Sequence, residues 1–268
     1  MQDVQSLPDE RDVALDQVGV SGLHHPIVVL DRASEKQRTI ARITMSVALP
    51  REQKGTHMSR FVEVLNDHHG EVTMRTVPAI LRDLRARLDA TRARIELTFP
   101  YFLERVAPVS RARALMDFEA SFIGTSDAKH DDFVLKVKVP VTSLCPCSKA
   151  ISKYGAHNQR GYVTVSVRSY PAEGDTLPQI VWIEELVSLA ESCASAPVYP
   201  LLKRPDEQHV TEQAYDNPVF VEDMVRNAAQ RLQDDPRIAW FHVHAENHES
   251  IHNHSAFAEV EWTRTGRR

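Results

Sequence analysis

The side chains of this sequence that are best suited to chemistry lie between residues 142 and 161. Cys145 and His157 are twelve residues apart there, and thiolate and imidazole are the ligands that zinc and similar transition metals prefer. Pro146 removes a backbone donor and keeps Cys145 extended, so we expect the thiol in a stiff turn. Two ligands do not complete a metal site, and a buried cysteine near a surface histidine would give the same pattern. We treat 142–161 as a candidate active-site loop.

A second group of candidates lies near the C-terminus. His242 and His244 alternate along a predicted strand, and a polar strand face explains both of them. Glu249 and His252 come after that strand, in a polar turn that precedes Ala256, where side chains can converge on a metal or a substrate. Only the latter two are therefore candidate site residues.

For two further carboxylates, a role in the site must be weighed against an ordinary structural role. Glu207 follows Lys203 and Arg204 in what the pattern predicts to be a Pro-flanked loop, and a surface carboxylate beside two cations would look the same. Glu222 lies in the first turn of a predicted helix, where acidic residues are common because they complement the helix dipole. Neither residue is assigned a role from the pattern alone.

Positive charge gathers around these motifs. A chain that is acidic overall would need such a cluster to hold a polyphosphate, although surface solvation explains any single member. Three of the cations stand inside the 142–161 segment, and two of these, Lys149 and Arg160, are the first choice. The candidates are Lys149, Arg160, Lys153, Lys203 and Arg204.

Composition limits the class of protein. The 268 residues are 42% hydrophobic and 26% charged, which is typical of one or two compact domains. A net charge of −5 argues against a general nucleic-acid or membrane-surface partner. The three cysteines, and an N-terminus without an apolar secretory core, predict a reduced protein of the cytoplasm.

Hydrophobic periodicity predicts the elements that must position these residues. Strands are expected where apolar residues alternate, and helices where they recur every three or four positions. The first half contains expected strands at 38–49, 94–102 and 114–123, helices at 58–65 and 80–88, and a shorter candidate strand at 27–30. The second half contains expected strands at 133–143, 161–170, 237–246 and 256–262, and helices at 183–190 and 221–232.

Both halves thus show the order ββααββ, which predicts an α+β protein with antiparallel sheets and helices packed on one face. We expect a first unit at residues 26–128 and a second unit at 129–268, which carries most of the candidate site residues. For the acidic, polar segment 1–25, order and disorder are equally expected.

Several segments resemble one known family. Ser-Leu-Cys-Pro-Cys-Ser-Lys at 143–149, followed by Gly-Ala-His-Asn-Gln-Arg at 155–160, resembles the signature of the type IB GTP cyclohydrolases. Apart from residues 1–25, the resemblance covers nearly the whole chain. The other matching segments are 55–61, 203–207, 210–212, 221–223 and 246–254.

The resemblance implies two tandem tunnelling-fold units in each subunit and a barrel-like homo-oligomer, with a tetramer favoured. It implies hydrolysis of GTP to formate and 7,8-dihydroneopterin triphosphate, the entry to folate-type pterin or deazapurine biosynthesis. It also implies active sites between subunits. Because Glu222 lies far along the chain from Cys145, we expect these two residues to come from different subunits.

The resemblance also implies roles for the candidates. Cys145, His157, Glu207 and His252 would hold a divalent metal, and this mixed donor set suits Mn²⁺ or Fe²⁺ as well as Zn²⁺, without an organic cofactor. A bound metal would lower the pKa of water toward neutrality. Glu249 would shuttle protons, with Cys145, His157 and His252 completing the catalytic set. Glu222 would bind the guanine edge, while Lys149, Arg160, Lys203 and Arg204 would hold the triphosphate.

Two alternatives remain open on the residues. One is a tunnelling-fold, NADPH-dependent nitrile reductase with a cysteine nucleophile that also precedes a proline. Against it, a thiol nucleophile does not need His157, Glu207 or His252. The other is a binding module in which the metal is a structural clip, which would leave no open position for water.

Overall fold

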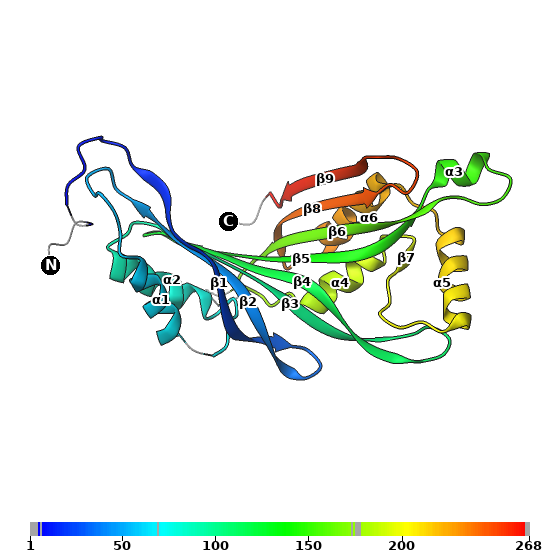
Figure 1. The fold of residues 1–268 in the computed structure, drawn as a ribbon, viewed down its shortest axis with the longest axis horizontal. Coiled ribbons are helices and arrows are strands. Elements are labelled where there is room, and N and C mark those ends of the chain that lie inside the picture. The colour runs from blue at the N-terminus through cyan, green and yellow to red at the C-terminus, as the bar shows by residue number, and fades with distance from the viewer. Residues whose placement is uncertain (1–4, 6, 69, 173, 175–177, 266–268) are drawn as a thin grey trace. The chain divides into compact units, whose positions relative to one another are not determined.

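The computed structural model describes residues 5, 7–68, 70–172, 174 and 178–265. The chain divides into two compact units (Figure 1). Unit 1 contains Met1–Pro100 and Ser121–Val134, and unit 2 contains Tyr101–Ala120 and Leu135–Arg268. Among the described residues, no helix combines the length and the hydropathy that a membrane span requires.

The expected element order is confirmed in the first half. It comprises β1 (Leu15–Asp31), β2 (Glu35–Leu49), α1 (Met58–Asp67), α2 (Val77–Leu88), β3 (Ala93–Val106) and β4 (Arg113–Ser126). The second half contains the expected elements and three others. It comprises β5 (Asp131–Leu144), α3 (Pro146–Ile151), β6 (Asn158–Ser169), α4 (Ile183–Glu191), β7 (Ala196–Pro197), α5 (Arg204–Asp216), α6 (Val221–Asp234), β8 (Ile238–His248) and β9 (Ser255–Thr263).

The strands form one sheet in the order β1-β2-β3-β4-β5-β6-β8-β9, and β7 pairs with β5. The strand pairs β1–β2, β2–β3, β5–β6, β6–β8 and β8–β9 are antiparallel. Helices pack on the strands of each unit, α1 on β1 and α2 on β2 in unit 1, and α4 on β6 and α6 on β8 and β9 in unit 2. The predicted α+β class with antiparallel pairing is confirmed.

In unit 2, α4 and α6 pack against the strands on which the candidate site is built. α6 contacts β8 and β9, and α4 contacts β6. The apolar stripes predicted for these helices are buried, as at Leu186 and Val225, and strand residues such as Val165 are buried as well. Cys193 is 1% exposed and belongs to this core, where burial raises the pKa of its thiol.

Strand β1 begins at Leu15, inside the segment for which the sequence predicts no particular structure. The expected strand at 27–30 is only its last part. Register shifts between Leu15 and Val18, and between Val20 and Leu23, interrupt the alternation of side chains. Because each shift moves later residues to the other face, the sequence of this strand has no continuous period of two.

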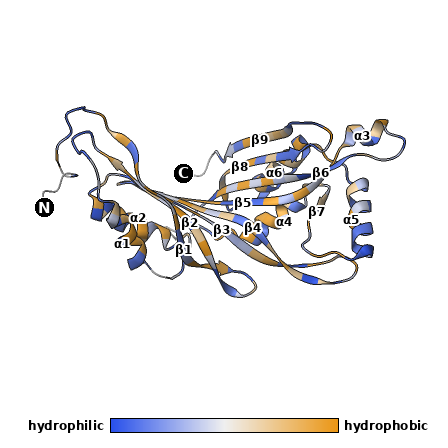
Figure 2. Ribbon diagram, in the orientation of Figure 1, coloured by the Kyte–Doolittle hydropathy of each residue, from blue (hydrophilic) through white to orange (hydrophobic). Residues whose placement is uncertain are grey.

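The predicted loop around Glu207 is wrong, because residues 204–216 form helix α5. Of this helix only Asp206 and Ala214 are buried, so it lacks the apolar stripe from which a helix is predicted. Figure 2 shows the difference, since the ribbon of α5 is largely hydrophilic and that of α4 largely hydrophobic. Likewise, the predicted loop after Cys145 contains the short helix α3, which buries no residue.

Candidate active site

The structure brings Cys145 and His157 together at the ends of two paired strands. Strands β5 and β6 pair as far as Leu144 and Asn158. One step beyond, the amide of Cys145 donates to the carbonyl oxygen of His157 at 3.1 Å. The two residues are therefore opposite each other, although the intervening chain includes a helix and a turn.

Cys145 is also the N-cap residue of α3. Its Sγ accepts a hydrogen bond from the amide of Ser148 at 3.3 Å, and its carbonyl accepts one from the amide of Lys149 at 3.1 Å. Cys145 is half-buried, whereas Cys147 in the first turn of the helix is exposed. The two thiols thus lie in different environments. The backbone of Cys145 is bonded to that of His157, and its Sγ is bonded to the first turn of α3.

A third strand adds a carboxylate to this pair. Strands β6 and β8 pair as far as Gly161 and Asn247, and the same register places Gln159 opposite Glu249. The Nε2 atom of Gln159 donates to Oε1 of Glu249 at 3.4 Å. Glu249 therefore lies beside β6, although it follows the end of β8.

His157 is the centre of these contacts. Its Nδ1 atom lies 2.7 Å from Oε1 of Gln159, 3.5 Å from Oγ of Ser250 and 4.0 Å from Oε2 of Glu249. The side chains of His157 and Glu249 are only 12% and 13% exposed. We call Cys145, His157, Gln159 and Glu249 the strand-end cluster. Sequence reasoning missed Gln159 and Ser250.

Buried polar groups support the cluster from within the sheet. Asn247 donates through Nδ2 to Oγ of Ser143 at 2.9 Å, and Ser143 donates to the carbonyl of Val219 at 3.2 Å. Gly161 makes room for this arrangement, because a Cβ atom there would lie 2.5 Å from Oδ1 of Asn247. Glycine is thus required by close approach and not by an unusual backbone angle.

The same network fixes the start of α6, which carries Glu222. The amide of Val219 donates to the carbonyl of Leu144 at 3.2 Å, next to Cys145. Glu222 is exposed in the first turn of α6, as predicted. The segment that leads into Glu222 and the strand end that leads into Cys145 are therefore neighbours within one chain.

A buried carboxylate, Asp206, holds the start of α5, where Lys203, Arg204 and Glu207 lie. Asp206 is 0% exposed, and its oxygens accept hydrogen bonds from the amides of Val109, Ser110 and Lys203, each at 2.8 Å. Burial by itself would raise the pKa of Asp206, but these bonds and the Ser110 hydroxyl hold it well below its ordinary value. This anchor fixes the N-terminal end of α5 to the β3–β4 connection.

Lys149 meets the opposite end of α5. Its Nζ donates to the carbonyl oxygen of Tyr215 and lies 4.2 Å from the centre of that ring. Glu207 and Tyr215 are eight residues apart in the helix, a separation of about 12 Å along its axis. Within one chain, Lys149 therefore contacts the end of α5 that is opposite to the end carrying Glu207.

Arg160 and His252 are also outside the cluster. Arg160 is exposed on the face of β6 opposite to that of Gln159, because successive strand residues alternate. His252 is exposed in the β8–β9 turn, where its ring stacks on that of His254 at 5.0 Å. Within the described part of the chain, no three His, Cys, Asp or Glu side chains gather in a way that could hold a metal ion.

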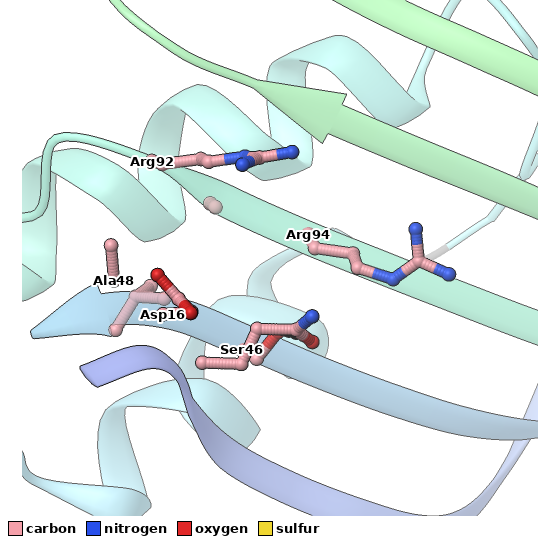
Figure 3. Close-up of a pocket in the computed structure, with 8 residues that line it drawn as sticks. Asp16, Ser46, Ala48, Arg92 and Arg94 are labelled. Carbon is pink, nitrogen blue, oxygen red and sulfur yellow. Dashed lines mark hydrogen bonds between the residues drawn. The ribbon is translucent and has the colours of Figure 1, made fainter.

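A separate small pocket lies in unit 1, and none of the candidate residues lines it. Its volume is about 80 Å³. Figure 3 shows Arg92 and Arg94 on one side and Asp16 and Ser46 on the other. Arg94 is paired with Glu96 at 3.0 Å. The pocket provides charged groups but none of the thiol or imidazole ligands considered above.

Comparisons with known proteins identify the family. The family model described as type I GTP cyclohydrolase folE2 matches residues 1–258. The chain belongs to this family. It is 54% identical over 262 residues to GTP cyclohydrolase FolE2 of Syntrophotalea carbinolica, covering 98% of this chain and 95% of the relative. It is 51% identical over 261 residues to GTP cyclohydrolase FolE2 of Nitrosococcus oceani, covering 97% and 95%. The resemblance stated from the motifs is confirmed.

Solved structures show the fold alone. Uricase from Arthrobacter globiformis superposes with a TM-score of 0.53 at 11% identity, covering 94% of each chain. A mutant urate oxidase from Bacillus sp. TB-90 gives a TM-score of 0.56 at 9% identity, covering 93% of this chain and 100% of the other. The predicted tunnelling fold is confirmed by this likeness.

Proposed function

We propose that this chain is a metal-dependent GTP cyclohydrolase I that converts GTP and water into formate and 7,8-dihydroneopterin triphosphate. One observation carries the proposal. This chain, which belongs to the family, joins Cys145 and His157 through a backbone hydrogen bond of 3.1 Å. Oε2 of Glu249 lies 4.0 Å from Nδ1 of His157. The family match favours this activity over the nitrile reductase and over the metal-clipped binding module.

The donor chemistry of the cluster fits a divalent transition metal. We propose that Sγ of Cys145 and Nε2 of His157 hold Zn²⁺, Mn²⁺ or Fe²⁺, because both atoms can present lone pairs on one side of the paired strands. Glu207 and His252 would complete the set from a second copy of the chain, since within the described part of one chain no three such side chains gather to hold a metal. When bound, such a metal supplies Lewis acidity that makes water a nucleophile near neutral pH.

The chain's own residues would then bind the substrate and move protons. The Glu222 carboxylate can accept two parallel hydrogen bonds, from guanine N1–H and from the 2-amino group. Glu249 is half-buried beside His157, where it can carry a proton to or from the purine ring nitrogens. Lys149, Lys203, Arg204 and Arg160 are the proposed partners of the triphosphate.

We also propose a homo-oligomer, with a tetramer favoured, that works in the cytoplasm without an organic cofactor. The three cysteines are free thiols, which is consistent with a reducing compartment. Tunnelling-fold units that assemble through their edges would bring the exposed Glu207 and His252 of one copy toward Cys145 of another.

One assay tests the function. Purified, metal-stripped protein is incubated with GTP and with Zn²⁺, Mn²⁺ or Fe²⁺ in turn, while formate release and pterin fluorescence are followed. We expect both products in equal amounts and only with added metal. Products that form at full rate in the presence of a strong chelator would contradict metal dependence, and GTP left intact with every metal would contradict the activity.

A further inference from the structure

Gln159 makes two contacts that a single amide group can satisfy in only one orientation. The residue is 7% exposed and lies on β6 between β5 and β8. Its Oε1 is 2.7 Å from Nδ1 of His157, and its Nε2 is 3.4 Å from Oε1 of Glu249. Because the amide oxygen only accepts and the amide nitrogen only donates, the oxygen must accept a hydrogen bond from Nδ1–H and the nitrogen must donate one to the carboxylate.

We propose that Gln159 is a positioning residue that sets the tautomer of His157 and the orientation of Glu249. A neutral imidazole carries one N–H. When that proton is on Nδ1 and bonded to Gln159, the lone pair is on Nε2, the atom that would bind the metal. The metal part of this inference rests on the proposed function, whereas the tautomer does not.

The neighbours of His157 make Gln159 the principal acceptor. Oε2 of Glu249 is 4.0 Å from Nδ1, too far for a hydrogen bond, and Oγ of Ser250 is 3.5 Å away, at the limit of one. Gln159 therefore stands between the imidazole and the carboxylate. Its neutral amide accepts the hydrogen bond from Nδ1–H through Oε1 and donates one to Oε1 of Glu249 through Nε2.

Two substitutions separate the two contacts. Gln159→Met has a similar volume but neither donates nor accepts as an amide does, so it removes both contacts. Gln159→Glu keeps an acceptor for Nδ1–H but cannot donate to Glu249 and places a like charge beside it. Gln17→Met is the matched control, because Gln17 accepts a hydrogen bond from the Ser46 hydroxyl at 3.1 Å in unit 1, among none of the candidate residues.

The first measurement is ¹⁵N NMR of histidine-labelled, metal-free protein above pH 8, with the His157 signals assigned by their loss in His157→Ala. We expect the Nδ1–H tautomer in the wild type, in Gln159→Glu and in the Gln17→Met control. In Gln159→Met we expect a shift toward Nε2–H, which is the form that free imidazole side chains favour. An Nε2–H tautomer in the wild type, or an unchanged pattern in Gln159→Met, overturns the proposal.

The second measurement is Zn²⁺ affinity by competition with a chelator, followed by steady-state kinetics. Loss of such an outer partner typically weakens metal binding by about 10- to 100-fold, which we expect for Gln159→Met but not for Gln159→Glu. Gln159→Glu should instead lower kcat with little change in KM, since Glu249 loses its donor. Equal Zn²⁺ affinity in all variants overturns the metal part. Wild-type protein that binds no metal would defeat the proposed function, while the NMR result would still decide the tautomer.

Discussion

The amide of Val219 donates to the carbonyl oxygen of Leu144 at 3.2 Å, although the two residues are 75 positions apart. Cys145 directly follows Leu144, and Glu222 is three residues after Val219. Distance along the chain is therefore no argument that Cys145 and Glu222 come from different subunits. That expectation now rests only on the resemblance, and the hydrogen bond favours a single chain for both.

Subunit mixing tests this relationship. Cys145→Ala and Glu222→Ala proteins, each inactive, are dissociated, mixed and reassembled. Because each site would draw both residues from one chain, we expect no activity in the mixed oligomers. Native mass spectrometry with one isotope-labelled partner must show that mixing took place. Substantial recovery of formate release would mean that the residues come from different chains.

The two thiols of the 142–161 segment should differ in their effect. Cys145 caps α3 and bonds to the backbone of His157, whereas Cys147 is exposed. We expect Cys145→Ala to fold, lose most of its metal and release no formate, while Cys147→Ala keeps both properties. Metal content by mass spectrometry and a GTP assay decide this. The reverse result would make Cys147 the ligand and leave the enzyme class unaffected.

Glu222→Gln should weaken the use of GTP but not metal binding. The amide would place an NH₂ group against the guanine donors, and loss of the paired contact should cost about 2 to 4 kcal/mol, roughly 30- to 1000-fold in kcat/KM.

Asp223→Asn is the control for Glu222→Gln, because Asp223 accepts from the amide of Phe220 at 3.0 Å and caps the same helix. It should lower the melting temperature more than it lowers kcat/KM. Unchanged kinetics in Glu222→Gln would leave Glu222 a residue that serves only the helix dipole.

Asp206 should make stability depend on acid pH. Its pKa in the folded protein lies below the ordinary value of 3.8, so its contribution is complete above that pH and is lost as pH falls toward the folded value. The measurement is the free energy of unfolding in urea for the wild type and for Asp206→Asn between pH 7 and pH 3. We expect a constant difference above about pH 5 that shrinks below about pH 4. A difference that stays constant down to pH 3 would contradict the lowered pKa.

Gly161→Ala should destabilise the protein through Asn247. The added Cβ would lie 2.5 Å from Oδ1 of Asn247, and such overpacking typically costs about 1 to 3 kcal/mol. Asn247→Ala in the same chain removes the clash, so the double variant should be more stable than the sum of the two single effects predicts. Strict additivity in thermal unfolding would show that the strain is relieved elsewhere.

The hydrophobic pattern predicts those strands and helices that bury a continuous apolar face. Strands and helices with a continuous apolar face, such as β8 and α6, were predicted near their true positions. Helix α5 was missed because its buried contact is Asp206, a carboxylate, and β1 was shortened because its bulges interrupt the alternation. The pairing of Cys145 with His157 was expected only from their types and from the resemblance.

Gln159 could not have been found in the same way. Its role depends on the register between β6 and β8, which places it opposite Glu249, and register is a property of the folded sheet and not of a local sequence pattern. One signal was present, since Gln159 shares with His157 the side of the strand that continues into Val163. A polar residue at an expected core position is reason to look for a partner.

The strand-end cluster continues the same side-chain rows that form the apolar core of unit 2. Ser143 and Cys145 follow Val141 on β5, while Gln159 and His157 extend the row of Val163 on β6. A slip of one residue in the pairing would therefore turn the core residues and the reactive residues to the wrong face together. Chains with a misaligned site would also have an exposed core and would not persist as folded protein, so the accuracy of the site is enforced by folding itself.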